Sequence, residues 1–189
     1  MSKSAKIQWT SFGVLAGVLL SGCAGFVSQK DREVSRVHLQ HASDLLGQRD
    51  YSKAIEAAND ALKADPTLAP AYNVIALTYL ETKRYEKSEE AFQKALAIQP
   101  AYPEVFNNLG VLYNRQEKFD LAVPWFKKAL ADDNYLTPEN AYTNLGYALY
   151  RQGKYADALD NHQKALDVSP LFCLASKNMG DVFAKQKAY

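Results

Sequence analysis

The sequence of 189 residues contains only two cysteines and three histidines, and its formal net charge is +1. Two cysteines are too few for the disulfide framework on which many small secreted domains depend. The balanced charge argues against nucleic acid as a partner, because nucleic-acid-binding proteins usually carry a basic face. The nine glycines are scattered and form no phosphate-binding loop. These absences leave a globular protein without an obvious chemical motif.

The sequence also lacks an apolar stretch of the roughly 20 residues that a transmembrane helix needs. Its strongest apolar run covers residues 12–20, follows Lys3 and Lys6, and leads into Leu20-Ser21-Gly22-Cys23. Basic residues, a short apolar run and small residues, in that order, are typical of a secretory signal peptide. We therefore predict a signal peptide over residues 1–22.

Leu20-Ser21-Gly22-Cys23 resembles the lipobox of bacterial lipoproteins. The resemblance implies cleavage before Cys23 and acylation of its thiol and of the new N-terminus. Several acyl chains anchor a protein stably, whereas a single chain binds a membrane only marginally. Ala24 replaces the aspartate that commonly retains such proteins in the inner membrane, which favours a lipid-anchored protein on the periplasmic face of the outer membrane. The alternative is an ordinary buried cysteine in a signal peptide.

After a predicted tether over residues 23–34, the sequence repeats itself. Aromatic residues recur at Tyr51, Tyr85, Phe119 and Tyr155, in steps of 34, 34 and 36 residues. A 34-residue period is typical of helix–turn–helix repeats. The pattern resembles the tetratricopeptide-repeat (TPR) family, which implies an all-α fold, a right-handed superhelix of helix pairs, over residues 35–189. The expected repeats are 35–68, 69–102, 103–136, 139–172 and a partial unit, 173–189, which is either a terminal cap or a truncated repeat.

The resemblance also assigns packing roles to recurring positions. The small residue late in the first helix of each unit, which lets the second helix approach closely, is the set Ala42, Ala76, Gly110, Gly146 and Gly180. The larger residue of the second helix is the set Ala58, Phe92, Phe126 and His162. His38 and His41 are three residues apart and would suit a shared metal on one helix face. Both fall on predicted packing positions, so we expect core histidines, no metal, no cofactor beyond the lipid, and no enzyme.

The same alignment predicts a partner-binding groove along the first helices of the units. Its candidate residues are Asn73, Leu77, Asn107, Asn108, Val111, Asn144, Tyr147, Tyr150 and Asn178. An asparagine side chain both donates and accepts hydrogen bonds, so a row of them would hold the backbone of an extended peptide. The alternative is that the amides brace the superhelix and the apolar residues belong to the core. Asn140 and Asn144 lack the basic side chains that a carboxylate-binding TPR groove requires.

The lipobox, the short tether and the connector Tyr135-Leu136-Thr137-Pro138-Glu139 together resemble the pilotins of type IV pilus systems. The resemblance implies a protein partner, a secretin subunit or another envelope protein, that the lipoprotein helps to assemble in the outer membrane. The alternative is a cell-envelope scaffold that docks peptidoglycan enzymes or outer-membrane assembly factors. With Cys23 acylated, Cys173 has no partner and is expected to be a partly buried apolar residue.

Overall fold

The computed structural model describes residues 27–187. The predicted signal peptide (residues 1–22), Cys23 and Tyr189 lie outside the described residues. Within residues 27–187 the chain forms nine α-helices and no strand, so the predicted all-α class is confirmed. No helix in this part of the chain combines the length and apolarity needed to cross a membrane.

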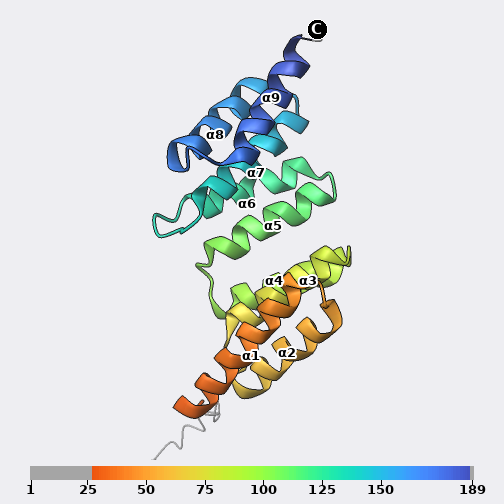
Figure 1. Ribbon diagram of the computed structural model, residues 1–189, viewed down its shortest axis with the longest axis vertical. Helices are drawn as coiled ribbons and strands as arrows, with labels where there is room; N and C mark the ends of the chain where they lie inside the picture. The colour runs from red at the N-terminus through yellow and green to blue at the C-terminus, as the bar shows by residue number, and fades with distance from the viewer. Residues whose placement is uncertain (1–26, 188–189) are drawn as a thin grey trace, which may run out of the picture.

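The helices follow one another as pairs in a single stack, from α1 at one end to α9 at the other (Figure 1). We call the first helix of each unit helix A and the second helix B. Their bounds are α1 (Gln29–Gly47), α2 (Tyr51–Ala64), α3 (Ala69–Glu81), α4 (Tyr85–Ile98), α5 (Pro103–Arg115), α6 (Phe119–Leu130), α7 (Pro138–Arg151), α8 (Tyr155–Val168) and α9 (Cys173–Lys187). The A helices α3, α5 and α7 each pack on their own B helix and on the preceding unit, while α1 packs on α2 and α3, and α9 on α7 and α8.

Helix α1 begins at Gln29, inside the segment 23–34 that the sequence analysis assigned to a tether. Its start is fixed by a capping box. The Ser28 hydroxyl accepts a hydrogen bond from the backbone N–H of Asp31, and the Asp31 carboxylate accepts one from the backbone N–H of Ser28. These bonds satisfy two backbone donors that a helix start otherwise leaves unpaired. The tether is therefore helical from Gln29 onward.

Within each unit the two helices meet at the predicted small and large positions. A Cβ atom added to Gly110 would overlap the ring of Phe126, and one added to Gly146 would lie 2.6 Å from Cε1 of His162. Phe126 and His162 are fully buried. Glycine is therefore required at both places by the ring that lies across the helix. Gly180, in α9, has nothing within 4 Å of the added Cβ, because no described helix B covers it.

The turns between helix A and helix B repeat one backbone conformation. Arg49, Lys83 and Glu117 have φ angles of 62°, 59° and 59°, and Gly153 has 77° at the corresponding place. This left-handed conformation suits glycine and is uncommon for other residues. Only the fourth unit has glycine at this place. The other three turns hold a non-glycine residue in the left-handed conformation, which makes the folded state less stable.

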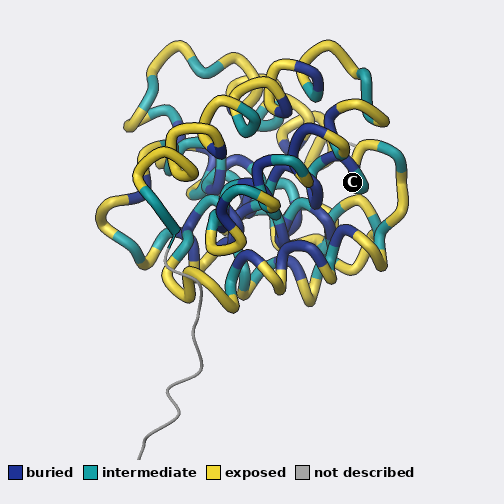
Figure 2. The backbone as a smooth tube through the Cα atoms, turned by 90° about the horizontal axis from the view of Figure 1, so that it is seen from below, coloured by how far each residue is buried: buried dark blue, intermediate teal, exposed yellow. Residues whose placement is uncertain are grey.

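Viewed along the stack, the buried residues gather at the centre and the exposed residues form the rim (Figure 2). One apolar cluster joins units one to three, and a second joins units three to five. The longer connector between α6 and α7 is held by Tyr135, which is buried with Phe106 and Ala129. Pro138 opens α7 at a position where its missing N–H costs no helical hydrogen bond. The repeats therefore share one continuous core.

Candidate partner-binding groove

The residues predicted to line the groove come from four successive A helices. Asn73 and Leu77 belong to α3, and Asn107, Asn108 and Val111 to α5. Asn144, Tyr147 and Tyr150 belong to α7, and Asn178 to α9. Contacts join α3 to α5, α5 to α7, and α7 to α9. The fold therefore places these residues along one face of the stack.

The asparagines bond to one another across successive units. Nδ2 of Asn108 donates to Oδ1 of Asn73 at 3.1 Å, which links α5 to α3. Nδ2 of Asn144 donates to Oδ1 of Asn107, also at 3.1 Å, which links α7 to α5. Nδ2 of Asn114 adds a bond of 3.2 Å to the backbone carbonyl of Asn144. The amides therefore brace the superhelix, which was the alternative reading of the asparagine row.

Bracing leaves part of each amide's capacity for a partner. An asparagine side chain carries two N–H donors and an oxygen with two lone pairs, and each pair described above uses one donor and one acceptor. Asn73, Asn108 and Asn144 are half-buried, whereas Asn107 is buried. Asn107 therefore contributes to the rigidity of the groove and presents little surface, while the other three remain within reach of a ligand.

The series of amide pairs changes at the last step. The next pair in register would join Asn178 of α9 to Thr143 of α7. Thr143 is 1% exposed, and its hydroxyl oxygen has no hydrogen-bond partner within the described part of the chain. The oxygen Oδ1 of Asn114 is likewise buried and unpartnered there. The amide pairs therefore run from α3 to α7 and stop there, and two buried oxygens of the groove, on α5 and α7, are left without partners in the described part of the chain.

The predicted apolar residues of the groove have a structural role as well as exposed surface. Leu77 and Val111 are half-buried against the first apolar cluster, and Tyr150 packs on the second. The ring of Tyr147 meets Phe119 edge-on, with ring centroids 6.2 Å apart. These side chains form a floor that is fixed before any partner arrives.

Two arginines along the edge of the groove tie successive units together. Arg115 donates to Glu81 at 2.6 Å, and Arg151 donates to Glu117 at 3.2 Å. Arg151 also donates to the hydroxyl oxygen of Tyr147 at 2.7 Å and lies 4.6 Å from the ring centre of Phe119. Apart from Tyr147, which lies on the same helix as Arg151, these partners come from the preceding unit.

The histidines do not form a chemical site. His162 is fully buried in the helix B packing position, as predicted. His38 is half-buried, but His41 is exposed, so the expectation that it is a core residue is wrong. Among the described residues, α1 packs only on α2 and α3, and no helix precedes it to cover His41. No group of three histidine, cysteine or acidic residues within residues 27–187 is placed to hold a metal ion.

Cys173 is exposed, which corrects the expectation of a partly buried residue. It is the first residue of α9, and its Sγ lies 3.4 Å from the carbonyl oxygen of Leu171. A cysteine at this place in an inner unit would be covered, as Pro103 is at the start of α5. In α9 no described unit follows to cover it.

The fold and the groove define a helical-repeat scaffold for contacts between proteins. The tetratricopeptide-repeat family model matches residues 67–134 and 102–170. The chain therefore belongs to the tetratricopeptide-repeat family. A search of curated proteins gives no match.

Several solved structures are similar to this chain. PilW, described as a widely conserved type IV pilus biogenesis factor, is 34% identical; the match covers 79% of this chain and 69% of PilW, with a TM-score of 0.75. PilF of Pseudomonas aeruginosa is 23% identical over 85% of this chain and 72% of PilF, with a TM-score of 0.79. YrrB, a TPR protein with an unusual peptide-binding site, is 22% identical over 84% and 80%, with a TM-score of 0.61. The protein thus resembles type IV pilus factors, and the two more distant structures support the fold alone.

Proposed function

We propose that this protein is an outer-membrane-anchored TPR lipoprotein that acts as a protein–protein adaptor of the pilotin kind in type IV pilus biogenesis. The observation that carries the proposal is the 34% identity to PilW over 79% of the chain. In the proposed mechanism the lipid on Cys23 supplies the membrane address, and the groove on α3, α5 and α7 binds a segment of a secretin subunit. The repeats are a scaffold, and no catalytic step is assigned to them.

The structure makes this division of labour physically reasonable. The groove side chains are already held by neighbouring units, so a partner segment loses its own conformational freedom while the groove loses little. A partner bound to an anchored protein is confined near the membrane, which raises its local concentration for assembly. Adaptor function therefore needs only two elements in this chain, the lipidated cysteine and a rigid binding face.

Replacing the lipidated cysteine tests the anchor. In Cys23→Ala we expect the protein to leave the outer-membrane fraction while its helical content is unchanged, because residue 23 lies outside the repeats. Secretin multimers in the outer membrane should fall at least several-fold. The matched control is Cys173→Ala, which removes the other, exposed cysteine and should change neither fractionation nor multimers. Normal multimers in Cys23→Ala would contradict the proposal.

Replacing groove residues tests the binding face. The double variant Asn144→Ala with Tyr147→Ala removes a half-buried amide and a phenol ring from adjacent turns of α7. We expect capture of the secretin subunit by in-cell crosslinking to fall about ten-fold or more. The control pair Gln93→Ala with Glu86→Ala removes two exposed side chains of α4, away from the groove.

The groove variant and its control should be compared at a temperature where circular dichroism shows both folded, because Asn144 also braces α5 against α7. Unchanged secretin capture by the folded groove variant would refute the assignment of the groove. Capture of cell-wall enzymes or assembly factors in place of a secretin would refute the pilotin role and leave the adaptor class.

A further inference from the structure

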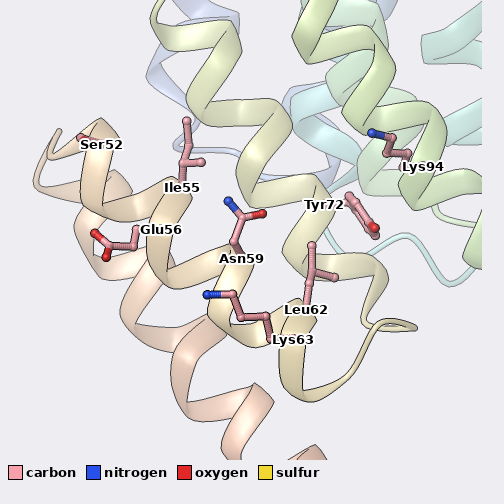
Figure 3. A pocket seen from close by; sticks show the side chains of 8 residues that line it. All are labelled: Ser52, Ile55, Glu56, Asn59, Leu62, Lys63, Tyr72 and Lys94. Atoms are coloured by element: carbon pink, nitrogen blue, oxygen red, sulfur yellow. The ribbon is translucent and has the colours of Figure 1, made fainter. Parts of the chain in front are cut away.

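The side of the stack formed by the B helices has a cavity between α2 and α4. The cavity measures about 260 Å³ and adjoins a wider furrow of about 770 Å³. Ile55 and Asn59 line it from α2, and Tyr72 forms its floor from α3. Ala91 and Lys94 line it from α4. Figure 3 shows the adjoining furrow, with Ile55, Asn59 and Leu62 along one side and Tyr72 and Lys94 along the other.

The repeat places an equivalent cavity between α6 and α8. There Tyr142 stands where Tyr72 does, Lys164 where Lys94 does, and Asn161 where Ala91 does. The two cavities therefore share an aromatic floor and a lysine at the rim. They differ at the helix B position that points into the space, which is alanine in one and a polar amide in the other.

The middle joint, the interface between α4 and α6, shows which side chain fits at the position of Ala91. Its residue equivalent to Ala91 is Trp125, and its floor is Phe106. The two rings are stacked, with centroids 6.0 Å apart and an interplanar angle of 30°. Nζ of Lys128, the residue equivalent to Lys94, lies 4.1 Å from the ring centre of Phe106 and 5.5 Å from that of Trp125. The chain itself thus places an indole on an aromatic floor beside an ammonium group.

Lys94, the lysine at the rim of the cavity between α2 and α4, can make the same contact if it leaves its present partner. Lys94 is paired with Glu90 at 2.7 Å, and both side chains are more than half exposed. In the middle joint Pro124 replaces that acid, and Lys128 lies over the rings. An exposed ion pair contributes little to stability, because water screens both charges. A cation–π contact with a bound ring is of similar size, so Lys94 can turn onto the ring at little cost.

We propose that the cavity between α2 and α4 binds a tryptophan side chain of a protein partner, stacked on Tyr72 and flanked by Lys94. Trp125 is the internal example of this geometry. Ala91 is the small residue at the position that Trp125 holds in the middle joint, and it leaves a cavity of about 260 Å³. The cavity between α6 and α8 measures about 420 Å³ but carries a polar residue there, Asn161, whose Nδ2 donates to the backbone carbonyl of Asp157. The site lies on the B-helix side and is distinct from the groove on the A helices, so it gives the adaptor a second contact.

The direct test is an NMR titration of the full chain carrying Cys23→Ala. The probe is a blocked pentapeptide with a central tryptophan and alanine elsewhere, and the reference probe is the all-alanine peptide. We expect saturable shifts of the backbone amides of Asn59 and Ala91 with the tryptophan peptide, with a Kd on the order of 1 mM. The all-alanine peptide should give none.

Two variants locate the binding. Ala91→Trp fills the cavity from within, in the manner of Trp125, and should weaken peptide binding at least ten-fold. Its matched control is Ala97→Trp, which adds an indole to an exposed position of the same helix and should bind the peptide normally. Tyr72→Ala removes the floor and should also abolish binding, which keeps the test decisive if Ala91→Trp does not fold.

The proposal is overturned if the tryptophan peptide gives no saturable shifts or binds no better than the alanine peptide. It is equally overturned if Ala91→Trp and Tyr72→Ala, both folded, bind the peptide as the parent chain does. Neither result would affect the proposed role of the groove, since Asn144 and Tyr147 lie on α7.

Discussion

Phe126→Ala should lower the free energy of unfolding by about 3–5 kcal/mol, the usual cost of removing a fully buried phenylalanine. The ring is 0% exposed and lies directly across Gly110, so the vacated space cannot be filled by a side chain from that helix. Urea unfolding followed by circular dichroism measures the change. The control is Phe183→Ala, whose ring is 48% exposed in α9 and should cost about 1 kcal/mol or less.

A pair of glycine variants checks the physical reason. Gly110→Ala should destabilise the protein, because the new Cβ would overlap the ring of Phe126. Gly180→Ala should stabilise it by about 0.5–1 kcal/mol, because alanine is the better helix former and nothing lies within 4 Å of the new atom. Equal effects of the two variants would show that the close approach of α6 to α5 is not what selects glycine.

Acidification should destabilise the protein through His162. The side chain is fully buried, neither ring nitrogen has a partner in the described part of the chain, and burial lowers the pKa of His162 to about 4 from its usual 6.5. The unfolded chain therefore binds a proton more readily than the folded chain. The free energy of unfolding therefore has its full value above pH 6.5 and falls progressively between pH 6.5 and 4. At about 1.4 kcal/mol per pKa unit, the loss is up to about 3 kcal/mol.

His162→Phe should remove this contribution. Phenylalanine occupies the equivalent positions at Phe92 and Phe126, and the change eliminates two buried polar atoms without partners, each of which costs about 1–3 kcal/mol. We expect higher stability at pH 7 and a difference from the parent chain that grows as the pH falls to 4. The control His41→Gln alters an exposed histidine and should change neither. A constant difference across this pH range would refute the role of His162.

The sequence predicts the features of this fold that every repeat shares. It says less about features that depend on whether a neighbouring unit is present and how closely it packs. The 34-residue period predicts the helix pairs and the burial of Phe92, Phe126 and His162, because each inner unit has the same surroundings. It does not predict the exposure of His41 and Cys173, because periodicity assumes a covering unit on both sides. The early start of α1 could have been read from Ser28 and Asp31, which have capping-box spacing.

The asparagine row shows a different limit of sequence reasoning. An amide at Asn107 or Asn144 is equally suited to hold a peptide or to hold the next helix, and the choice depends on how far apart successive A helices lie. At the distances found here Asn144 reaches Asn107, and Asn108 reaches Asn73. Sequence spacing alone does not contain that distance. The sequence does not predict the cavity beside Ala91 for the same reason. The one indication it contains is the change in side-chain size between Ala91 and Trp125 at equivalent positions of two units.

Every unit in the described part of the chain touches only the units next to it, and no contact joins α1 or α2 to α5 or beyond except through α3 and α4. The stability of such a molecule is therefore approximately a sum over its units and the interfaces between neighbouring units, which is not true of a closed globule. A duplicated inner unit would meet the same two surfaces that its original meets. Changing the number of units would therefore lengthen or shorten the binding face in steps of one repeat, with the chemistry of each step unchanged.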